Sequence, residues 1–246
     1  MEWFGPSFFL NLLAGGFLDA WFQKLYKTFI AKGYYTMLFE GFRNTIIITL
    51  GALVIGVVIG TLIAVIKYFA EDVPALKPFA VLCNVYVNVI RGIPMTVLLL
   101  IFFYVVFATA KNGIPVAIVA FGVNSGAYMA ELIRSGLNAV DHGQMEAGRS
   151  LGLSKLQCMQ KIIMPQAVRY ILPAIGNELI ALLKETSVAG YVAVVDLTRA
   201  GNLIRNNTFD AVNTLALVAI IYLLMSLVLT KLLSIMERRL AASDKR

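Results

Sequence analysis

Residues 45–66 read TIIITLGALVIGVVIGTLIAVI and contain no charged side chain. An apolar helix of ~20 residues is long enough to cross the ~30 Å hydrocarbon core of a bilayer. The whole chain has the same character, because 59% of its 246 residues are hydrophobic and 14% are charged, whereas soluble domains carry about 25% charged residues. We therefore predict an all-α integral membrane protein.

Four further segments are apolar enough to span a membrane, which makes five core transmembrane helices within residues 41–236. These four segments are residues 79–110, 114–133, about 170–195, and 212–235. Residues 237–246 are predicted to form a cytoplasmic tail. In the first span, Gly56 and Gly60 form a Gly-x-x-x-Gly pair, which predicts close packing against another helix.

Residues 1–40 form a separate N-terminal segment. Aromatic and aliphatic side chains recur at helical spacing from Phe17 to Ile30, and Lys24 and Lys27 belong to the opposite face. This pattern is typical of an amphipathic helix that lies at the membrane surface. A sixth span over residues 3–18 is the alternative, although Pro6 and polar residues shorten its apolar run.

The distribution of Lys and Arg predicts the orientation. More of these residues fall in the segments on the side of the C-terminus, and cytoplasmic loops carry the excess of positive charge. We therefore expect the N-terminus outside and the C-terminus in the cytoplasm. The start Met1-Glu2-Trp3 lacks the positive charge of a cleavable signal peptide, so we expect the spanning helices to direct insertion.

The segment between the third and fourth spans, residues 141–165, reads as two short cytoplasmic helices. Met145 to Leu151 can form about two turns, and Gly152 can adopt the left-handed conformation that ends a helix. Ser154 and Gln157 have the spacing of a capping box. Pro165 is expected to break the second helix.

The first of these helices is rich in small side chains. Ala147, Gly148 and Ser150 would let its backbone approach another surface closely. Because an isolated helix of two turns is unstable in water, it needs a surface to dock against. That surface is either another protein or the rest of its own subunit, and the residues alone leave both interpretations open.

The spacing of Glu146-Ala147-Gly148, Gly152, Ile162 and Met164-Pro165 resembles the signature loop of binding-protein-dependent ABC permeases. Gly148 stands where the family has a second Ala, and Met164 where it has Leu; both changes are small. The resemblance implies a coupling helix that docks into a groove on a separate ATPase subunit. The implied docking residues are Glu146, Ala147, Gly148, Ser150, Leu151 and Gly152.

Four further motifs are similar to the polar amino acid subfamily of these permeases. They are Asn44-Thr45, Arg91-Gly92-Ile93-Pro94, Ser125-Gly126-Ala127-Tyr128-Met129-Ala130-Glu131 and Leu183-Lys184-Glu185-Thr186-Ser187. The subfamily usually has Asp in place of Glu185 and Thr in place of Ile93, which weakens any assignment of one particular solute.

This resemblance implies a multi-pass permease subunit in the inner (plasma) membrane of a bacterium. It implies an importer of polar or charged amino acids with a second permease chain, identical or related. It also implies ATPase subunits that bind ATP and Mg²⁺, and an extracytoplasmic solute-binding protein.

Charged residues inside the predicted spans mark functional positions, because each costs about 2.5–3.5 kcal/mol near the bilayer centre. These residues are Arg91, Glu131, Glu178, Lys184 and Glu185. Glu131 lies three residues before Arg134, which predicts an ion pair between them. Lys184 and Glu185 diverge around the helix, so one of them can pair with another helix.

Two sets of residues are candidates for the solute pathway. Arg91, Gly92 and Pro94 break the second span, either as a structural kink or as a group in contact with solute. In the fourth span an amide and a carboxylate near mid-membrane can bind an ammonium or guanidinium group, and third-span side chains can complete such a site. These residues are Asn177 and Glu178, with Asn124, Ser125 and Tyr128. Interhelical hydrogen bonding is the alternative role.

The sequence contains no Gly-x-x-x-x-Gly-Lys-Ser/Thr phosphate loop, no nucleophile–base pair and no metal cluster. Cys83 and Cys158 are too few and too far apart to indicate a disulfide framework or a metal site, and no basic stripe indicates nucleic acid. We therefore expect a non-catalytic chain without a cofactor.

Two other classes of protein remain as alternatives. One is an ion-coupled secondary transporter with Glu131, Glu178 and Lys184 as a relay, although we find no internal repeat of the kind common in such proteins. The other is a membrane sensor or scaffold whose loop recruits a signalling partner.

Overall fold

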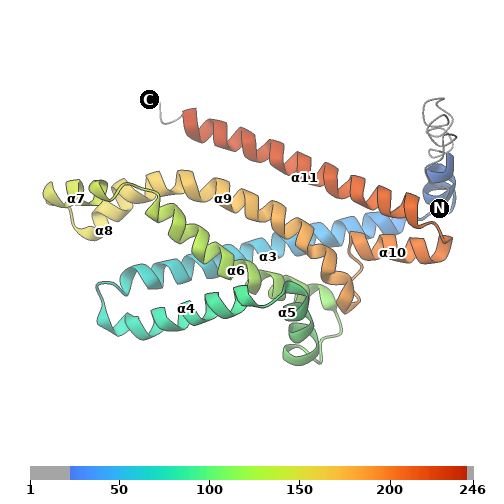
Figure 1. Ribbon diagram of the computed structural model, residues 1–246, viewed down its shortest axis with the longest axis horizontal. Helices are drawn as coiled ribbons and strands as arrows, with labels where there is room; N and C mark the ends of the chain where they lie inside the picture. The colour runs from blue at the N-terminus through green and yellow to red at the C-terminus, as the bar shows by residue number, and fades with distance from the viewer. Residues whose placement is uncertain (1–22, 243–246) are drawn as a thin grey trace, which may run out of the picture.

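The computed structural model describes residues 23–242 of the chain (Figure 1). Every regular element within this range is helical, which confirms the predicted all-α class. Five long helices run back and forth along the longest axis of the molecule. They are α3 (Tyr35–Phe69), α4 (Lys77–Gly92), α6 (Gly113–Asn138), α9 (Met164–Glu185) and α11 (Ala211–Ala242).

Shorter helices connect the long ones. The α-helical connectors are α5 (Met95–Ile101), α7 (His142–Ser150), α8 (Lys155–Cys158) and α10 (Leu197–Thr208). The segments η1 (Tyr26–Ala31), η3 (Phe102–Val106) and η4 (Met159–Ile163) are π-helical, and η2 (Pro74–Leu76) and η5 (Thr186–Val192) are 3₁₀-helical.

Three of the long helices, α3, α6 and α11, are each long and apolar enough to cross a membrane alone, and α4 with α5 forms a fourth, bent span. The helix α9 is more polar, but its 22 residues extend ~33 Å. It packs beside α6 and α11, along the long axis of the molecule. These five units correspond to the five predicted spans. Figure 1 places α7, α8 and the α3–α4 turn at one end of the bundle, and α10 and the start of α3 at the other.

The break in the second span is sharper than a kink. The axes of the two halves differ by 109°, so α5 lies across the direction of α4 (Figure 1). Ile93 is extended, with φ −99° and ψ 130°, because a residue before proline is pushed out of the helical region. Pro94 then begins the turn into α5.

The first span is longer than predicted. The helix α3 begins at Tyr35, two residues after Gly33, which has a positive φ of 75°. It therefore includes residues from the predicted N-terminal segment. Of the predicted surface helix, residues 17–22 lie outside the described range, as does the alternative span over residues 3–18. Phe29 is buried against Leu38 and Ile204, so this part of the helix packs on the protein.

The fourth span is shorter than predicted, because α9 ends at Glu185 and not near residue 195. The Thr186 hydroxyl donates to the carbonyl of Leu183 at 2.7 Å, and Ala193 adopts a left-handed conformation with φ 59°. Asp196 then caps α10 by accepting hydrogen bonds from the backbone N–H groups of Thr198 and Arg199. Burial raises the pKa of the Asp196 carboxyl to about 6.

The predicted break at Pro165 is wrong. The chain passes from α8 through η4 into α9 without interruption, because the N–H of Met164 donates to the carbonyl of Met159 one residue further back than in an α-helix. Pro165 therefore sits in the first turn of α9, where a missing N–H is tolerated. The predicted cytoplasmic loop is thus continuous with the long helix α9.

The helices α3 and α6 pack at very short range, as the Gly56–Gly60 pair predicts. A Cβ atom on Gly60 would clash with Met129 and lie 2.8 Å from the backbone nitrogen of Ala130. In the other direction, a Cβ on Gly126 would lie 2.7 Å from Ile59. Each helix therefore offers glycines to the larger side chains of the other.

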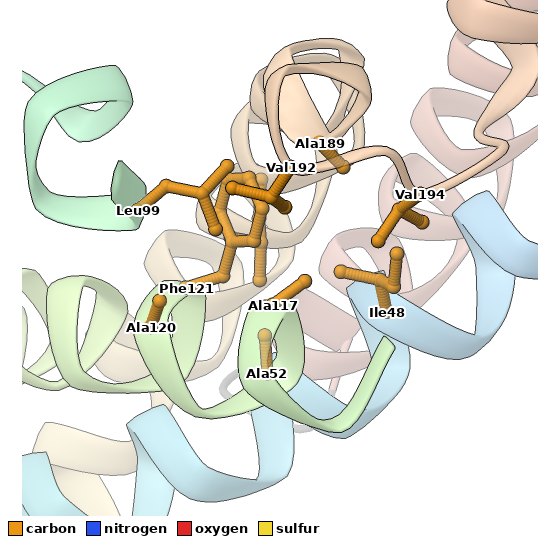
Figure 2. Close-up of a cluster of buried hydrophobic side chains, with 10 residues drawn as sticks. Ile48, Ala52, Leu99, Ala117, Ala120, Phe121, Ala189, Val192 and Val194 are labelled. Carbon is orange, nitrogen blue, oxygen red and sulfur yellow. The ribbon is translucent and has the colours of Figure 1, made fainter. Parts of the chain in front are cut away.

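A buried apolar cluster extends this contact toward the end of the bundle where α5 and η5 lie. Figure 2 shows Ile48 from α3 and Phe121 from α6 beside Leu99 of α5 and Val192 of η5. The cluster anchors the break after α4 and the turn after α9 on the α3–α6 pair.

We expect Gly60→Ala to lower the stability of the purified protein. Overpacking of a tight core typically costs about 1–3 kcal/mol, and here the new methyl group meets backbone atoms of α6 that a rotamer change cannot move. Thermal unfolding in detergent measures the effect. Gly92→Ala is the matched control, because a Cβ at that position has no heavy atom within 4 Å; equal melting temperatures for the two variants would contradict the close packing.

Candidate functional site

The loop between α6 and α9, residues 141–165, has a defined architecture around α7. The Asp141 side chain accepts a hydrogen bond from the N–H of Gly143 at 2.6 Å and caps the start of the helix. At the other end, Gly152 has a φ of 84°, and the N–H groups of Gly152 and Leu153 donate to the carbonyls of Arg149 and Gly148. This is a Schellman motif, and it confirms the predicted stop at Gly152.

The predicted capping box starts the second helix of the loop. The N–H of Gln157 donates to Ser154 Oγ at 3.2 Å, and the N–H of Ser154 donates to Gln157 Oε1 at 2.8 Å. The two helices are therefore separated by a turn of fixed geometry, and α7 has a fixed orientation relative to α8.

The outer side of α7 is open. Leu151 is 82% exposed, and Glu146, Ala147, Ser150 and Gly152 near it are exposed as well. The Ser150 hydroxyl donates to the carbonyl of Glu146 at 2.9 Å, so toward another chain its oxygen can only accept hydrogen bonds. An exposed leucine beside small residues and a carboxylate offers a shallow contact surface for another chain.

Gly148, which belongs to the predicted docking set, is buried against its own subunit. A Cβ at this position would lie 2.7 Å from Cys158 Sγ and 2.9 Å from Ile162 Cδ1. Its small size therefore serves the packing of α7 on α8 and η4. The sequence left open whether α7 docks on its own subunit or on another protein. Its inner face packs on its own subunit, and its outer face is exposed.

An ionic contact that the sequence did not predict joins the loop to the turn between α3 and α4. Lys155 Nζ lies 2.8 Å from Asp72 Oδ2, 3.3 Å from Glu71 Oε2 and 5.0 Å from the centre of the Tyr68 ring. The hydrogen bond to Asp72 is the main cause that raises the pKa of Lys155. Lys155 and Glu71 lie 84 residues apart in the chain, so no local sequence pattern could predict this contact.

A cavity of about 460 Å³ lies between this loop and the ends of α3 and α6. Lys67 and Arg134 line it, and both pair with Glu131, at 3.7 Å and 2.8 Å. The Glu131–Arg134 pair confirms the prediction from their spacing. The apolar part of the wall includes Met145 and Met159 from the loop.

Within the membrane, one predicted pair of pathway residues meets across two helices. The hydroxyl of Ser125 on α6 donates to Glu178 Oε1 on α9 at 3.2 Å. Ser125 is fully buried and Asn124 nearly so, whereas Glu178 is half-buried. The close approach of α3 also fixes Ser125, because a Cβ on Gly56 would lie 2.7 Å from its Oγ.

A second pair links the helix break to α6. The guanidinium of Arg91 lies 5.2 Å from the centre of the Tyr128 ring, close enough for a cation–π interaction. Arg91, Gly92 and Pro94 are exposed in this chain. The break thus lies beside a predicted pathway residue.

Two of the remaining predicted membrane residues, Asn177 and Lys184, are exposed on α9 and are not brought to these pairs. Glu185 is half-buried, and it lies two helical turns after Glu178 on the same side of α9, near enough for their charges to interact. Asn177 therefore faces away from the protein side on which its neighbour Glu178 meets Ser125.

The opposite end of the bundle carries a second cavity. It has a volume of about 570 Å³ and lies between η5 and α10. Polar side chains of Ser187, Thr198, Arg199 and Asn202 line it together with Tyr191 and Ala193.

Several known proteins are similar to this chain. It is 32% identical over 211 residues to the probable glutamine ABC transporter permease protein GlnM of Bacillus subtilis (strain 168), which covers 85% of this chain and 95% of that protein. It is 31% identical over 216 residues to the arginine transport system permease protein ArtQ of the same organism, covering 83% and 93%.

The fold is shared with a solved transporter. The crystal structure of an amino acid ABC transporter with histidines superposes with a TM-score of 0.79 at 37% identity, over 86% of this chain and 98% of that one. Residues 56–242 match the family model of the binding-protein-dependent transport system inner membrane component. The chain is therefore a member of this family of membrane permease subunits.

Proposed function

We propose that this chain carries polar or charged amino acids inward as the permease subunit of an ATP-driven importer. The observation that carries the proposal is the capped helix α7, whose outer face is exposed and whose inner face is fixed to α8 and η4. Its relatives are named for glutamine and arginine transport, which supports a polar cargo.

In this proposal α7 is a coupling helix that docks on a separate ATPase subunit. Glu146, Ala147, Ser150, Leu151 and Gly152 form the docking face. Because α8, η4 and α9 are one continuous helical path, a displacement of α7 passes directly into a spanning helix. ATP and Mg²⁺ are bound by the ATPase, and this chain supplies no catalytic residue.

The other partners follow from the same assignment. A second permease chain, identical or related, pairs with this one in the bacterial inner membrane, and a solute-binding protein delivers the amino acid on the outer side. The N-terminus lies outside and the C-terminus in the cytoplasm. The excess of Lys and Arg on the side of the loop supports this orientation.

The solute pathway passes the contact between α6 and α9. Glu178 supplies a carboxylate that can bind the ammonium or guanidinium group of an amino acid, and Ser125 holds that carboxylate in place. Arg91 beside Tyr128 offers an opposite charge for a carboxylate. ATP drives the cycle only if the inward-open and outward-open states bind ATP and solute with different affinities.

Two observations favour this function over the alternatives. Glu131 is occupied by Arg134 and Lys67, which leaves it poorly suited to carry ions in a relay. The family match extends over residues 56–242, so it includes the spans as well as the loop, whereas a sensor or scaffold would need only the loop to be retained.

Glu146→Lys should impair the contact with the ATPase, because it reverses a charge on the exposed face of α7. We expect ATP-dependent uptake into vesicles to fall about tenfold, which corresponds to ~1.4 kcal/mol, while the permease still inserts. Co-purification of the ATPase measures docking directly. Gln160→Lys, an exposed position on η4 outside the docking face, is the control. Normal docking and uptake by Glu146→Lys would contradict the assignment.

Glu178→Gln should reduce the uptake of arginine. Hydrogen bonds to charged groups contribute about 1.5–3 kcal/mol, so we expect a ten- to hundredfold lower kcat/KM in vesicles that contain the whole transporter. Glu40→Gln, an exposed glutamate near the start of α3, controls for the loss of a carboxylate elsewhere. If arginine and glutamine are both transported with unchanged kinetics by Glu178→Gln, the residue does not lie on the pathway.

A further inference from the structure

The cavity between η5 and α10 lies at the end of the bundle opposite to α7 (Figure 1). We refer to it as the η5–α10 cavity, and the residues that line it include Ser187, Tyr191, Ala193, Arg199 and Asn202. Its volume of about 570 Å³ falls within the range of roughly 300–1,000 Å³ that small-molecule sites occupy. Tyr191 is 66% exposed, and Ala193 and Arg199 are exposed as well, so the cavity is open to solvent.

Arg199 differs from the lysine and arginine side chains that line the cavity beside the loop. In that cavity Lys67 and Arg134 both pair with Glu131, and Lys155 pairs with the carboxylates of the α3–α4 turn. The guanidinium of Arg199, by contrast, has no ion pair and no hydrogen bond within residues 23–242. Because a guanidinium is always charged and carries five N–H donors, Arg199 can bind an acceptor group of a ligand.

The fold fixes the position of Arg199 at the wall of the cavity. Its backbone N–H donates to Asp196 Oδ1 at 3.2 Å, as part of the cap of α10. A Cβ on Gly190 would lie 3.1 Å from Arg199 Cβ and 3.4 Å from Arg199 Cδ, so the stem of the side chain lies against the backbone of η5. Asp196 is buried and accepts from the N–H groups at the start of α10. The base and the stem of Arg199 are therefore held, while its charged end stays unpaired.

Two other polar side chains of the wall are also without partners. Asn202 follows Arg199 by three positions on α10, so the two lie on the same side of that helix, and Ser187 comes from η5. In the described part of the chain, neither the Asn202 amide nor the Ser187 hydroxyl forms a hydrogen bond. A guanidinium binds a carboxylate through two parallel hydrogen bonds, and hydroxyl and amide oxygens accept hydrogen bonds from an ammonium group. The wall thus offers groups for both charged ends of an α-amino acid.

The η5–α10 cavity directly follows the proposed pathway along the chain. Ser187 comes two positions after Glu185, the last residue of α9. Glu185 and Glu178 are near enough for their charges to interact. A solute that enters from this end therefore meets a cation first and carboxylates afterwards. This order suits a zwitterion that is held first by its carboxylate and then by its ammonium group.

We propose that the η5–α10 cavity is an entry subsite of the importer, at which Arg199 binds the α-carboxylate of the amino acid before the solute passes to Glu178. This proposal rests on the proposed import of amino acids. Because the α-carboxylate is common to all amino acids, the subsite takes glutamine and arginine alike. The side chain of the solute is recognised elsewhere.

Protection of a cysteine in the cavity tests occupancy directly. Ala193→Cys places a thiol in the wall without removing a polar group, and mass spectrometry follows its modification by a water-soluble maleimide. The sample is the permease–ATPase complex, reconstituted in vesicles without the binding protein. We expect glutamine to slow the modification several-fold, whereas its α-amide, which lacks the carboxylate, should leave the rate unchanged. Cys83, on α4 outside the cavity, is the internal reference, whose modification neither compound should alter.

Variants at Arg199 identify the group that binds. In the Ala193→Cys chain, Arg199→Ala should abolish the protection by glutamine, and Arg199→Lys, which keeps the charge, should retain part of it. Arg205→Ala is the matched control, because Arg205 lies on the same helix but does not line the cavity, and it should retain full protection. Protection that is absent in the Ala193→Cys parent, equal with the amide, or retained in Arg199→Ala would overturn the subsite.

Uptake measurements distinguish this failure from failure of the proposed function. In vesicles with ATP, the ATPase and the binding protein, Arg199→Ala should lower kcat/KM about tenfold for both glutamine and arginine, as expected for the loss of a hydrogen bond to a charged group. If the unaltered transporter takes up neither solute, the proposed function fails and the entry role fails with it. If it takes up both and glutamine gives no protection, the function stands and the subsite alone is refuted.

The binding protein supplies the remaining outcome. An acidic side chain on its surface could pair with Arg199 in place of the solute. If Arg199→Ala weakens the association of the binding protein with the transporter while glutamine still protects residue 193, the cavity is a docking surface for that protein. The solute subsite is then refuted.

Discussion

The close contact of α3 with α6 is the constraint on which the rest of the structure depends. Glycines on each helix receive larger side chains from the other, as Gly60 receives Met129 and Gly126 receives Ile59. Lipid gives no hydrophobic drive for helices to associate, so such van der Waals packing must hold them together. The break after α4 and the turn after α9 are both anchored on this pair, and Ser125 is presented to α9 from its surface.

The loop between α6 and α9 combines a fixed internal geometry with an exposed outer face. Its geometry is fixed by local hydrogen bonding, namely the Asp141 cap, the Schellman motif at Gly152 and the Ser154–Gln157 capping box. Its outer face consists of Leu151 and the neighbouring exposed residues. Gly148 helps to fix the geometry of the loop, since it packs on Cys158 and Ile162.

Sequence patterns predicted the features that depend on interactions between residues close in the chain. The apolar runs, the Gly152 stop, the capping box and the Glu131–Arg134 pair depend on residues close in sequence, and each was predictable. The ionic contact of Lys155 joins segments 84 residues apart, and no periodicity encodes it. The sequence also could not reveal that Pro165 continues a helix, because this depends on a π-helical turn in the backbone before it.

That π-helical turn also sets the angular register between the loop and α9. Each hydrogen-bonded turn of η4 contains one residue more than a turn of an α-helix. In the chain, η4 lies between α7 and α9. Removing the extra residue would return this segment to α-helical spacing and would change how α8 is placed relative to α9. The placement of the loop against the spanning helix α9 therefore depends on the hydrogen bonding of a single backbone turn.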